Sequence, residues 1–179
     1  DLAGVLTNGS VVTGSSAANT ITGSGLVDQI DGGAGDADTL SIVDAAAGGG
    51  TTTVGALNSA SASVVSNFET LNMTSADADF AVDMDTVAGV TAVTMTAAEA
   101  AADTLFTLTD LDATQAANLT LTVSGGVATT DASVDVDIKT NTTSDAAVLN
   151  ATVTADSQQV HLTDTAANEF ESATVNLSG

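Results

Sequence analysis

The sequence predicts an all-β protein built as a β-solenoid, in which short strands stack as successive rungs. Two observations predict this fold. The 179-residue chain is 44% hydrophobic but only 2% aromatic and has no Trp or Tyr, so its core must be assembled from Val, Leu, Ile and Ala, which suit thin stacked layers. Short apolar segments also recur at short intervals between Gly, Asp and Asn residues. A β-sandwich is the alternative fold.

Three short segments near the N-terminus repeat one pattern. In each, an Asn or Asp and one polar residue precede an aliphatic residue, and these aliphatic residues, Ile21, Ile30 and Leu40, lie 9 and then 10 residues apart. Glycine-bearing turns at 23–25 and 32–35 separate the segments. Glycine reaches backbone conformations that other residues avoid, so several carbonyl groups can converge, and a following carboxylate completes an oxygen cage for Ca²⁺.

This region, about residues 14 to 43, resembles the RTX calcium-binding nonapeptide, in which a Gly-Gly-x-Gly-x-Asp turn precedes a short strand. The segments 32–40 and 23–30 match with one additional residue before Asp38 and Asp28, and the first copy carries Asn19 where Asp is expected. The resemblance implies a β-roll with turns alternating on two sides. It therefore implies one Ca²⁺ between the turns that end at Asn19 and Asp38. The turn that ends at Asp28 would need a fourth turn as its partner, for which the segment 44–50 is the candidate.

Carboxylates spaced one residue apart extend the set of candidate ligands, because on a strand both side chains share a face and repel unless a cation bridges them. For Asp77 and Asp79, calcium binding and a solvated loop both remain open. For Asp135 and Asp137 a solvated polar face is expected. The candidate calcium ligands are Asn19, Gly23, Gly25, Asp28, Asp31, Gly32, Ala34, Asp36, Asp38, Asp77 and Asp79.

Beyond residue 50, apolar and polar residues alternate in segments that recur roughly every 10 to 15 residues. The expected strands are Glu69–Thr74, Phe80–Met84, Thr91–Thr96, Leu105–Thr109, Asn118–Val123, Ser133–Ile138, Val148–Thr154, Gln159–Thr163 and Ala173–Ser178. A helical turn is expected at Ala97–Asp103, and loops at 48–53 and 125–131. Residues 1–50 would then form the RTX-like calcium-binding β-roll section, and residues 51–179 parallel β-helix rungs continuous with it.

The segment Phe68-Glu69-Thr70-Leu71-Asn72 is similar to a phrase of RTX-bearing bacterial surface-layer proteins (S-layer proteins). That resemblance implies a structural protein of an extracellular lattice or filament, exported by type I secretion and folded by calcium afterwards. Its partners would be further copies of itself at the cell surface, and a cell-surface polysaccharide is a further candidate. A calcium-dependent adhesin module of a large secreted protein is the alternative function.

The charge balance points to the same class of protein. The chain has 23 acidic residues against one Lys and no Arg, which gives a formal net charge of −22. Such a charge excludes nucleic acid as a partner and favours divalent counter-ions, although a solvated halophilic surface would also account for it. There is no Cys, and no apolar run is long enough to insert into a membrane. A chain that begins at Asp1 is expected to be a processed product or a fragment.

Enzymatic activity is not expected. Polysaccharide-cleaving solenoids pair carboxylates with aromatic and basic residues that bind the sugar, and this chain has one Lys and no Trp or Tyr. His161 is expected to be an outward strand residue. Ice binding is also less favoured, because the Thr-x-Thr pairs that start at Thr107, Thr120 and Thr152 lie 13 and then 32 residues apart rather than at one period.

Overall fold

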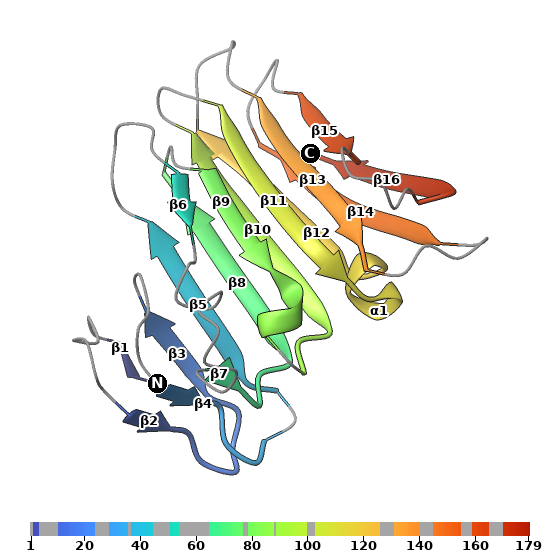
Figure 1. The fold of residues 1–179 in the computed structure, drawn as a ribbon. Helices are drawn as coiled ribbons and strands as arrows, with labels where there is room; N and C mark the ends of the chain where they lie inside the picture. Colours follow the sequence, from blue (N-terminus) through green and yellow to red (C-terminus); the bar gives the residue numbers. More distant parts are fainter. Residues whose placement is uncertain are drawn as a thin grey trace.

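The computed structural model describes residues 2–3, 11–23, 29–35, 37–44, 51–53, 65–76, 79–87, 89–99, 103–125, 131–139, 145–154, 159–164 and 170–179. These residues form a β-solenoid of three parallel sheets (Figure 1). Sheet A comprises, in spatial order, β1 (Leu2–Ala3), β3 (Thr20–Gly23), β5 (Thr39–Asp44), β8 (Thr70–Ser75), β10 (Ala92–Glu99), β12 (Leu119–Gly125), β14 (Ala146–Val153) and β16 (Ser172–Ser178).

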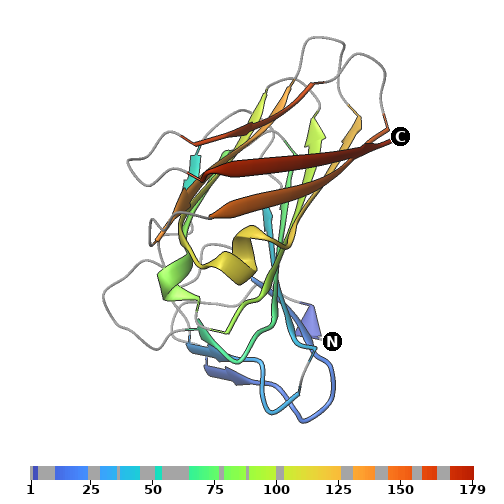
Figure 2. The ribbon, with the colours of Figure 1, turned by 90° about the vertical axis from the view of Figure 1, so that its right-hand side faces the viewer.

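Sheet A is accompanied by two shorter sheets. Sheet B contains β2 (Val11–Thr13), β4 (Gln29–Asp31) and β7 (Val65–Ser66), and sheet C contains β6 (Thr51–Thr53), β9 (Asp79–Asp83), β11 (Thr104–Leu111), β13 (Ala132–Ile138) and β15 (Val160–Thr163). Every strand pairing in the described part of the chain is parallel, which confirms the solenoid and excludes the antiparallel β-sandwich. The strands of sheet A turn progressively from β5 to β16 (Figure 2).

The solenoid has two rung sizes. At the N-terminal end the chain alternates between sheets A and B, and the paired residues Leu2, Ile21 and Leu40 recur at a constant interval, the length of two nonapeptides and one further residue. Further on the chain alternates between sheets A and C, and the interval grows, since Leu71 pairs with Val93 and Leu119 with Leu149. The narrow rungs therefore agree with a β-roll section that continues as wider β-helix rungs.

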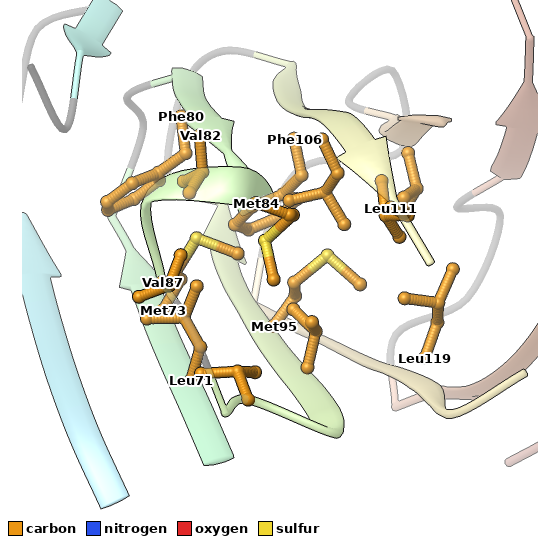
Figure 3. Close-up of a cluster of buried hydrophobic side chains, with 14 of the residues drawn as sticks. Leu71, Met73, Phe80, Val82, Met84, Val87, Met95, Phe106, Leu111 and Leu119 are labelled. Atoms are coloured by element: carbon orange, nitrogen blue, oxygen red, sulfur yellow. The ribbon is translucent and has the colours of Figure 1, made fainter. Parts of the chain in front are cut away.

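The wider rungs enclose a larger core than the composition suggests. Three of the four Phe residues and all three Met residues are at most 2% exposed, namely Phe68, Phe80, Phe106, Met73, Met84 and Met95. Figure 3 shows all of them except Phe68 among the buried side chains that it labels. Phe80 and Phe106 occupy the same position on consecutive rungs and stack with ring centroids 5.7 Å apart. The expectation of a core made only from Val, Leu, Ile and Ala is therefore wrong, because a wide rung leaves an interior that small side chains do not fill.

The nine predicted strands are confirmed as β8 to β16, with ends that differ by at most three residues. The helical turn predicted at Ala97–Asp103 is wrong for its first three residues, which continue β10 in register with β12. Thr51–Thr53, predicted as a loop, forms β6. The helices among the described residues are the 3₁₀ turn η1 (Met84–Thr86) and the short α1 (Ala113–Ala116), which begins with a capping box at Asp112 and Gln115. No helix in the described part of the chain has the length and apolarity to cross a membrane.

Candidate metal centre

Two turns stack directly on each other at one side of the narrow rungs. The first, residues 14–19, connects β2 to β3, and the second, residues 32–38, connects β4 to β5. Backbone hydrogen bonds join them along their length: Gly14 N donates to Asp31 O at 2.7 Å, Ala34 N to Ser15 O at 3.2 Å, and Thr39 N to Asn19 O at 2.7 Å. These are the two turns between which the sequence places a calcium ion.

Glycines allow this close stacking. A Cβ on Gly14 would lie 1.8 Å from the carbonyl oxygen of Gly32, and a Cβ on Gly33 would lie 2.3 Å from that of Ser15. Gly33 also has a φ of 107°, in the region that favours glycine. The glycines therefore bring the carbonyl groups of one turn against the backbone of the next.

The carboxylate of Asp38 is completely buried where the two turns meet. Its Oδ1 accepts hydrogen bonds from the backbone N–H of Asn19 at 2.6 Å and from the Asn19 side-chain amide at 3.0 Å. Its Oδ2 is also buried and has no hydrogen-bond partner among the described residues. A buried carboxylate oxygen without a partner is costly, and a cation or a hydrogen-bond donor would offset that cost.

The free oxygen of Asp38 faces another oxygen. The position of a Cβ on Gly35 would lie 3.0 Å from Asp38 Oδ2 and 3.1 Å from the carbonyl oxygen of Ala17. The space that the glycine leaves open is therefore bordered by a carboxylate oxygen and a carbonyl oxygen. Both atoms carry negative partial charge, which a cation or a hydrogen-bond donor would satisfy.

The side-chain amide of Asn19 lies among more acceptors than it can serve. Its Nδ2 is within hydrogen-bond distance of Ser15 O at 3.2 Å, Gly32 O at 3.2 Å and Asp38 Oδ1 at 3.0 Å, and it also contacts Ala17 O. An amide nitrogen has two N–H groups, so four oxygens exceed its capacity. Rotation of the amide by half a turn would place Oδ1 there instead, and the group would then consist of oxygens only.

Glu69 connects this site to the wide rungs. Its Oε2 accepts the backbone N–H of Asp38 at 2.7 Å, while Asp38 O accepts from the backbone N–H groups of Glu69 and Thr70, both at 3.1 Å. The same arrangement recurs at the other end of sheet A, where Glu171 Oε2 accepts the backbone N–H of Asp145 at 2.7 Å. The Phe-Glu phrase at 68–69 and again at 170–171 therefore holds the start of a sheet A strand to the rung before it.

Of the eleven predicted ligands, the structure brings together Asn19, Gly32 and Asp38. Gly23 ends β3 away from Asn19, and Ala34 holds the turns together through its N–H. Asp31 Oδ1 is engaged by Gly33 N at 2.9 Å and Asn67 Nδ2 at 2.8 Å, and Asp79 Oδ1 accepts Leu105 N in sheet C. The other four lie outside the described residues: Gly25, Asp28, Asp36 and Asp77.

Sequence reasoning missed the carbonyl groups of Ser15 and Ala17, because the first turn lacks the inner glycines of the nonapeptide and gave no reason to single these residues out. It also missed the link from Glu69, although the Phe-Glu phrase that contains it occurs twice and could have been noticed. Both contributions come from contacts between rungs.

Apart from the Asp38 site, a row of carboxylates lies along sheet C, at one end of its strands. Its members recur at one constant interval along the chain: Asp83, Asp110, Asp137 and Asp164. Asp110 has a φ of 57°, next to a register shift between β11 and β13. Burial raises the pKa of Asp137, and the charges of Asp110, Asp164 and Asp135 raise it further. Oδ1 of Asp137 is inaccessible and has no hydrogen-bond partner in the described part of the chain, which corrects the expectation of a fully solvated residue.

Asp137→Asn is expected to stabilise the protein at neutral pH. The folded-state pKa of Asp137 lies above its ordinary value of 3.8, so its charged form opposes folding at pH 7. Removing the charge should raise the free energy of unfolding by roughly 0.2–1 kcal/mol, the scale of surface charge pairs. The gain should shrink as pH falls through the folded-state pKa and as salt is added. Urea titrations at pH 7 and pH 3.5 measure it; a gain of equal size at both would contradict the electrostatic cause.

The one Lys of the chain plays no part in either turn. Lys139 pairs with Asp85, and this hydrogen bond raises the pKa of the Lys139 ammonium. His161 is exposed on β15, as expected, with Nε2 3.9 Å from Asp131 Oδ2. Among the described residues no three His, Cys, Asp or Glu side chains converge on one point, so a metal between the turns would depend on backbone carbonyl groups around Asp38.

The candidate site is thus a buried carboxylate with one unpaired oxygen, surrounded by carbonyl oxygens from two stacked turns. Comparisons of the chain with models of protein families, with curated proteins and with solved structures gave no match.

Proposed function

We propose that this chain is a structural protein of a bacterial extracellular lattice or filament, of the surface-layer type, which calcium folds and assembles. The observation that supports this proposal most is the buried Asp38 carboxylate, whose Oδ2 has no partner among the described residues, in a protein with a net charge of −22. Secretion to the cell surface by the type I route belongs to the same proposal and rests on the resemblance of the turns to the RTX nonapeptide.

The chemistry of the donors favours calcium over other metals. The groups around the open position at Gly35 are the two carboxylate oxygens of Asp38 and the carbonyl oxygen of Ala17. Oxygen ligands of mixed type suit Ca²⁺, which tolerates irregular coordination, better than Mg²⁺, which demands a regular octahedron. The chain offers no Cys for a thiolate site.

Assembly is supported by the edge of sheet A. All seven residues of β16 are exposed, and Val175 and Leu177 are 41% and 68% exposed although they continue the buried row of Leu149 and Ala151. Such an edge can pair with a further rung. That rung could come from a longer chain or from a second copy.

Calcium removal tests the first half of the proposal. Excess EDTA should loosen the narrow rungs, because a ligand that binds only the folded state stabilises it by about 2.7 kcal/mol at 100 times its dissociation constant. Circular dichroism and thermal melting with calcium, and with EDTA, provide the measurement. Identical spectra and midpoints in both would contradict calcium-coupled folding.

The second half is tested by light scattering and electron microscopy, with calcium or magnesium at matched ionic strength. Ordered sheets or filaments should form with calcium and not with magnesium. A monomer in both solutions would instead favour the adhesin module, whose partner would be a foreign ligand such as a cell-surface polysaccharide.

A further inference from the structure

The outer face of sheet A carries two unbroken columns of small polar side chains. Strand pairing places the residues of each column side by side, one per rung. The first column is Asn72, Thr94, Thr120, Asn150 and Asn176, and the second is Thr74, Thr96, Thr122, Thr152 and Ser178. The irregular spacing of Thr-x-Thr pairs along the sequence therefore does not prevent a ladder, because connections of different length absorb the differences. Thr107, which had been counted with them, belongs to sheet C.

Hydrogen bonds within the columns hold these side chains in place. Asn176 Nδ2 donates to Asn150 Oδ1 at 2.9 Å, and the hydroxyl groups of Thr152 and Ser178 are 3.0 Å apart. Asn72 Nδ2 extends the first column by donating to Ser41 Oγ on β5 at 3.2 Å. The face is thus ordered before any partner binds, which lowers the entropy cost of covering it.

Charge distinguishes this face from the other broad face of the solenoid. Among the sheet A residues from β3 to β16 whose exposure the structure describes, no outward position is occupied by an acidic or basic residue. Sheet C instead presents carboxylates at Asp79, Asp83, Asp135 and Asp137. In a protein with a net charge of −22, the sheet A face is the broad face at which two copies can meet without bringing carboxylates together.

We propose that the outer face of sheet A is a contact surface between copies of this chain, packed face to face. The seven strands from β3 to β16 span roughly 34 Å at about 4.8 Å per strand, and a width of about 20 Å gives a plane of roughly 700 Å². That is close to the about 800 Å² per partner of a standard interface. This inference deepens the proposed lattice or filament and rests on it.

The twist of the sheet decides between a second copy and a flat crystalline partner. Successive strands of sheet A turn relative to one another (Figures 1 and 2), so an ice plane or a crystalline polysaccharide would touch only a few rungs. Two copies of the same twisted sheet pack over their whole area when their strands cross at about −30°.

A matched pair of charge insertions tests the inference. Thr96→Asp places a carboxylate in the middle of the sheet A face. Thr107→Asp places one on the outer face of sheet C, also on a central strand, and both Thr residues are half-buried. In calcium, Thr96→Asp should raise the concentration needed for assembly at least about tenfold, because like charges meet across the contact. Thr107→Asp should change it less than about twofold, since Thr107 lies outside the contact. Circular dichroism in calcium checks that both variants fold.

A second variant covers the case in which Thr96→Asp does not fold. The chain has no Cys, so Thr96→Cys and Thr107→Cys each carry one thiol, which can be labelled after folding with a negatively charged reagent. Labelling at position 96 alone should block assembly, and assembly should protect that thiol.

The outcomes separate the two proposals. If every variant assembles at the same concentration as the unmodified protein, the proposed sheet A contact is wrong and the proposed lattice function still stands. A monomeric unmodified protein in calcium would overturn both. Protection of the Thr96→Cys thiol in the monomer by a soluble polysaccharide, or inhibition of ice recrystallisation that Thr96→Asp abolishes, would assign the face to that partner instead.

Discussion

Replacing Phe106 by Ala should lower the free energy of unfolding by about 3–5 kcal/mol, the usual cost of truncating a buried Phe. Phe106 is fully buried between Phe80 and Val134 on the neighbouring rungs, and its ring stacks on that of Phe80. The truncation would open a cavity that two rungs border. Because each rung of a solenoid contacts only its neighbours, the loss of stability should be confined to the wide rungs.

Leu105→Ala is the matched control for this truncation. Leu105 is the preceding residue of β11 but points outward and is 37% exposed, so its truncation should cost no more than about 0.5 kcal/mol. Urea titrations in saturating calcium measure both variants. Equal losses would show that the alternation of β11, and with it the register of sheet C, is wrong.

Asp38→Asn should remove one site from the calcium titration, or weaken it at least about 100-fold, since even residues that only support a metal ligand cost about 10- to 100-fold when lost. The amide of Asn is uncharged, so the variant avoids the cost of burying a carboxylate oxygen that has no partner among the described residues. In EDTA the variant should therefore be at least as stable as the unmodified protein. A residue with a purely structural role would lose stability in both conditions. Titration calorimetry and melting in EDTA supply the two readouts.

Asn19→Asp should act in the opposite direction, because it places a second carboxylate beside Asp38 and restores the residue that the nonapeptide pattern expects. Calcium affinity should rise, and stability in EDTA should fall. Asp135→Asn is the control, since Asp135 lies on sheet C and accepts a hydrogen bond from Thr163. Unchanged affinity in all three variants would place calcium elsewhere or nowhere.

The sequence predicted strands well where the hydrophobicity of each residue matches its burial. Along β13, Ala132, Val134, Val136 and Ile138 are buried and the residues between them are not, so alternation alone locates the strand. The stacking of the Asn19 and Asp38 turns was implied by the resemblance to the RTX nonapeptide, in which successive turns alternate on two sides.

What the sequence could not supply was the assignment of strands to sheets. Thr94 and Thr107 look alike in the sequence, yet they lie on different faces, because the lengths of the intervening connections vary. Ala97 to Glu99 has helical composition, but pairing with β12 overrides that preference. Contacts between rungs, which single-sequence patterns do not encode, decide both cases.

The acidic composition has a structural role that the net charge conceals. Many carboxylates accept backbone N–H groups at the corners of rungs, where a strand begins and its N–H would otherwise be unpaired. Three of these bonds link one rung to the next at the start of sheet C strands: Leu105 N donates to Asp79 Oδ1, Asp131 N to Asp103 Oδ1, and Gln159 N to Asp131 Oδ1. The chain therefore stabilises its carboxylates largely without basic side chains. Among the described residues, the buried oxygens Asp38 Oδ2 and Asp137 Oδ1 are the carboxylate exceptions.

The continuity of sheet A across the change of rung size determines how the chain would respond to tension. Hydrogen bonds between rungs run along the long axis of a solenoid, so a pull along that axis would load one ladder at a time and detach rungs singly from the ends. Each detached rung would release roughly 60–110 Å of extended chain, depending on its width. At the joint between narrow and wide rungs, the β5–β8 pairing of sheet A, the short β4–β7 pairing of sheet B and the Glu69–Asp38 bond carry the load. Calcium between the turns of Asn19 and Asp38 would hold the last two narrow rungs together beside that joint. A surface coat built from such chains would lengthen stepwise under strain.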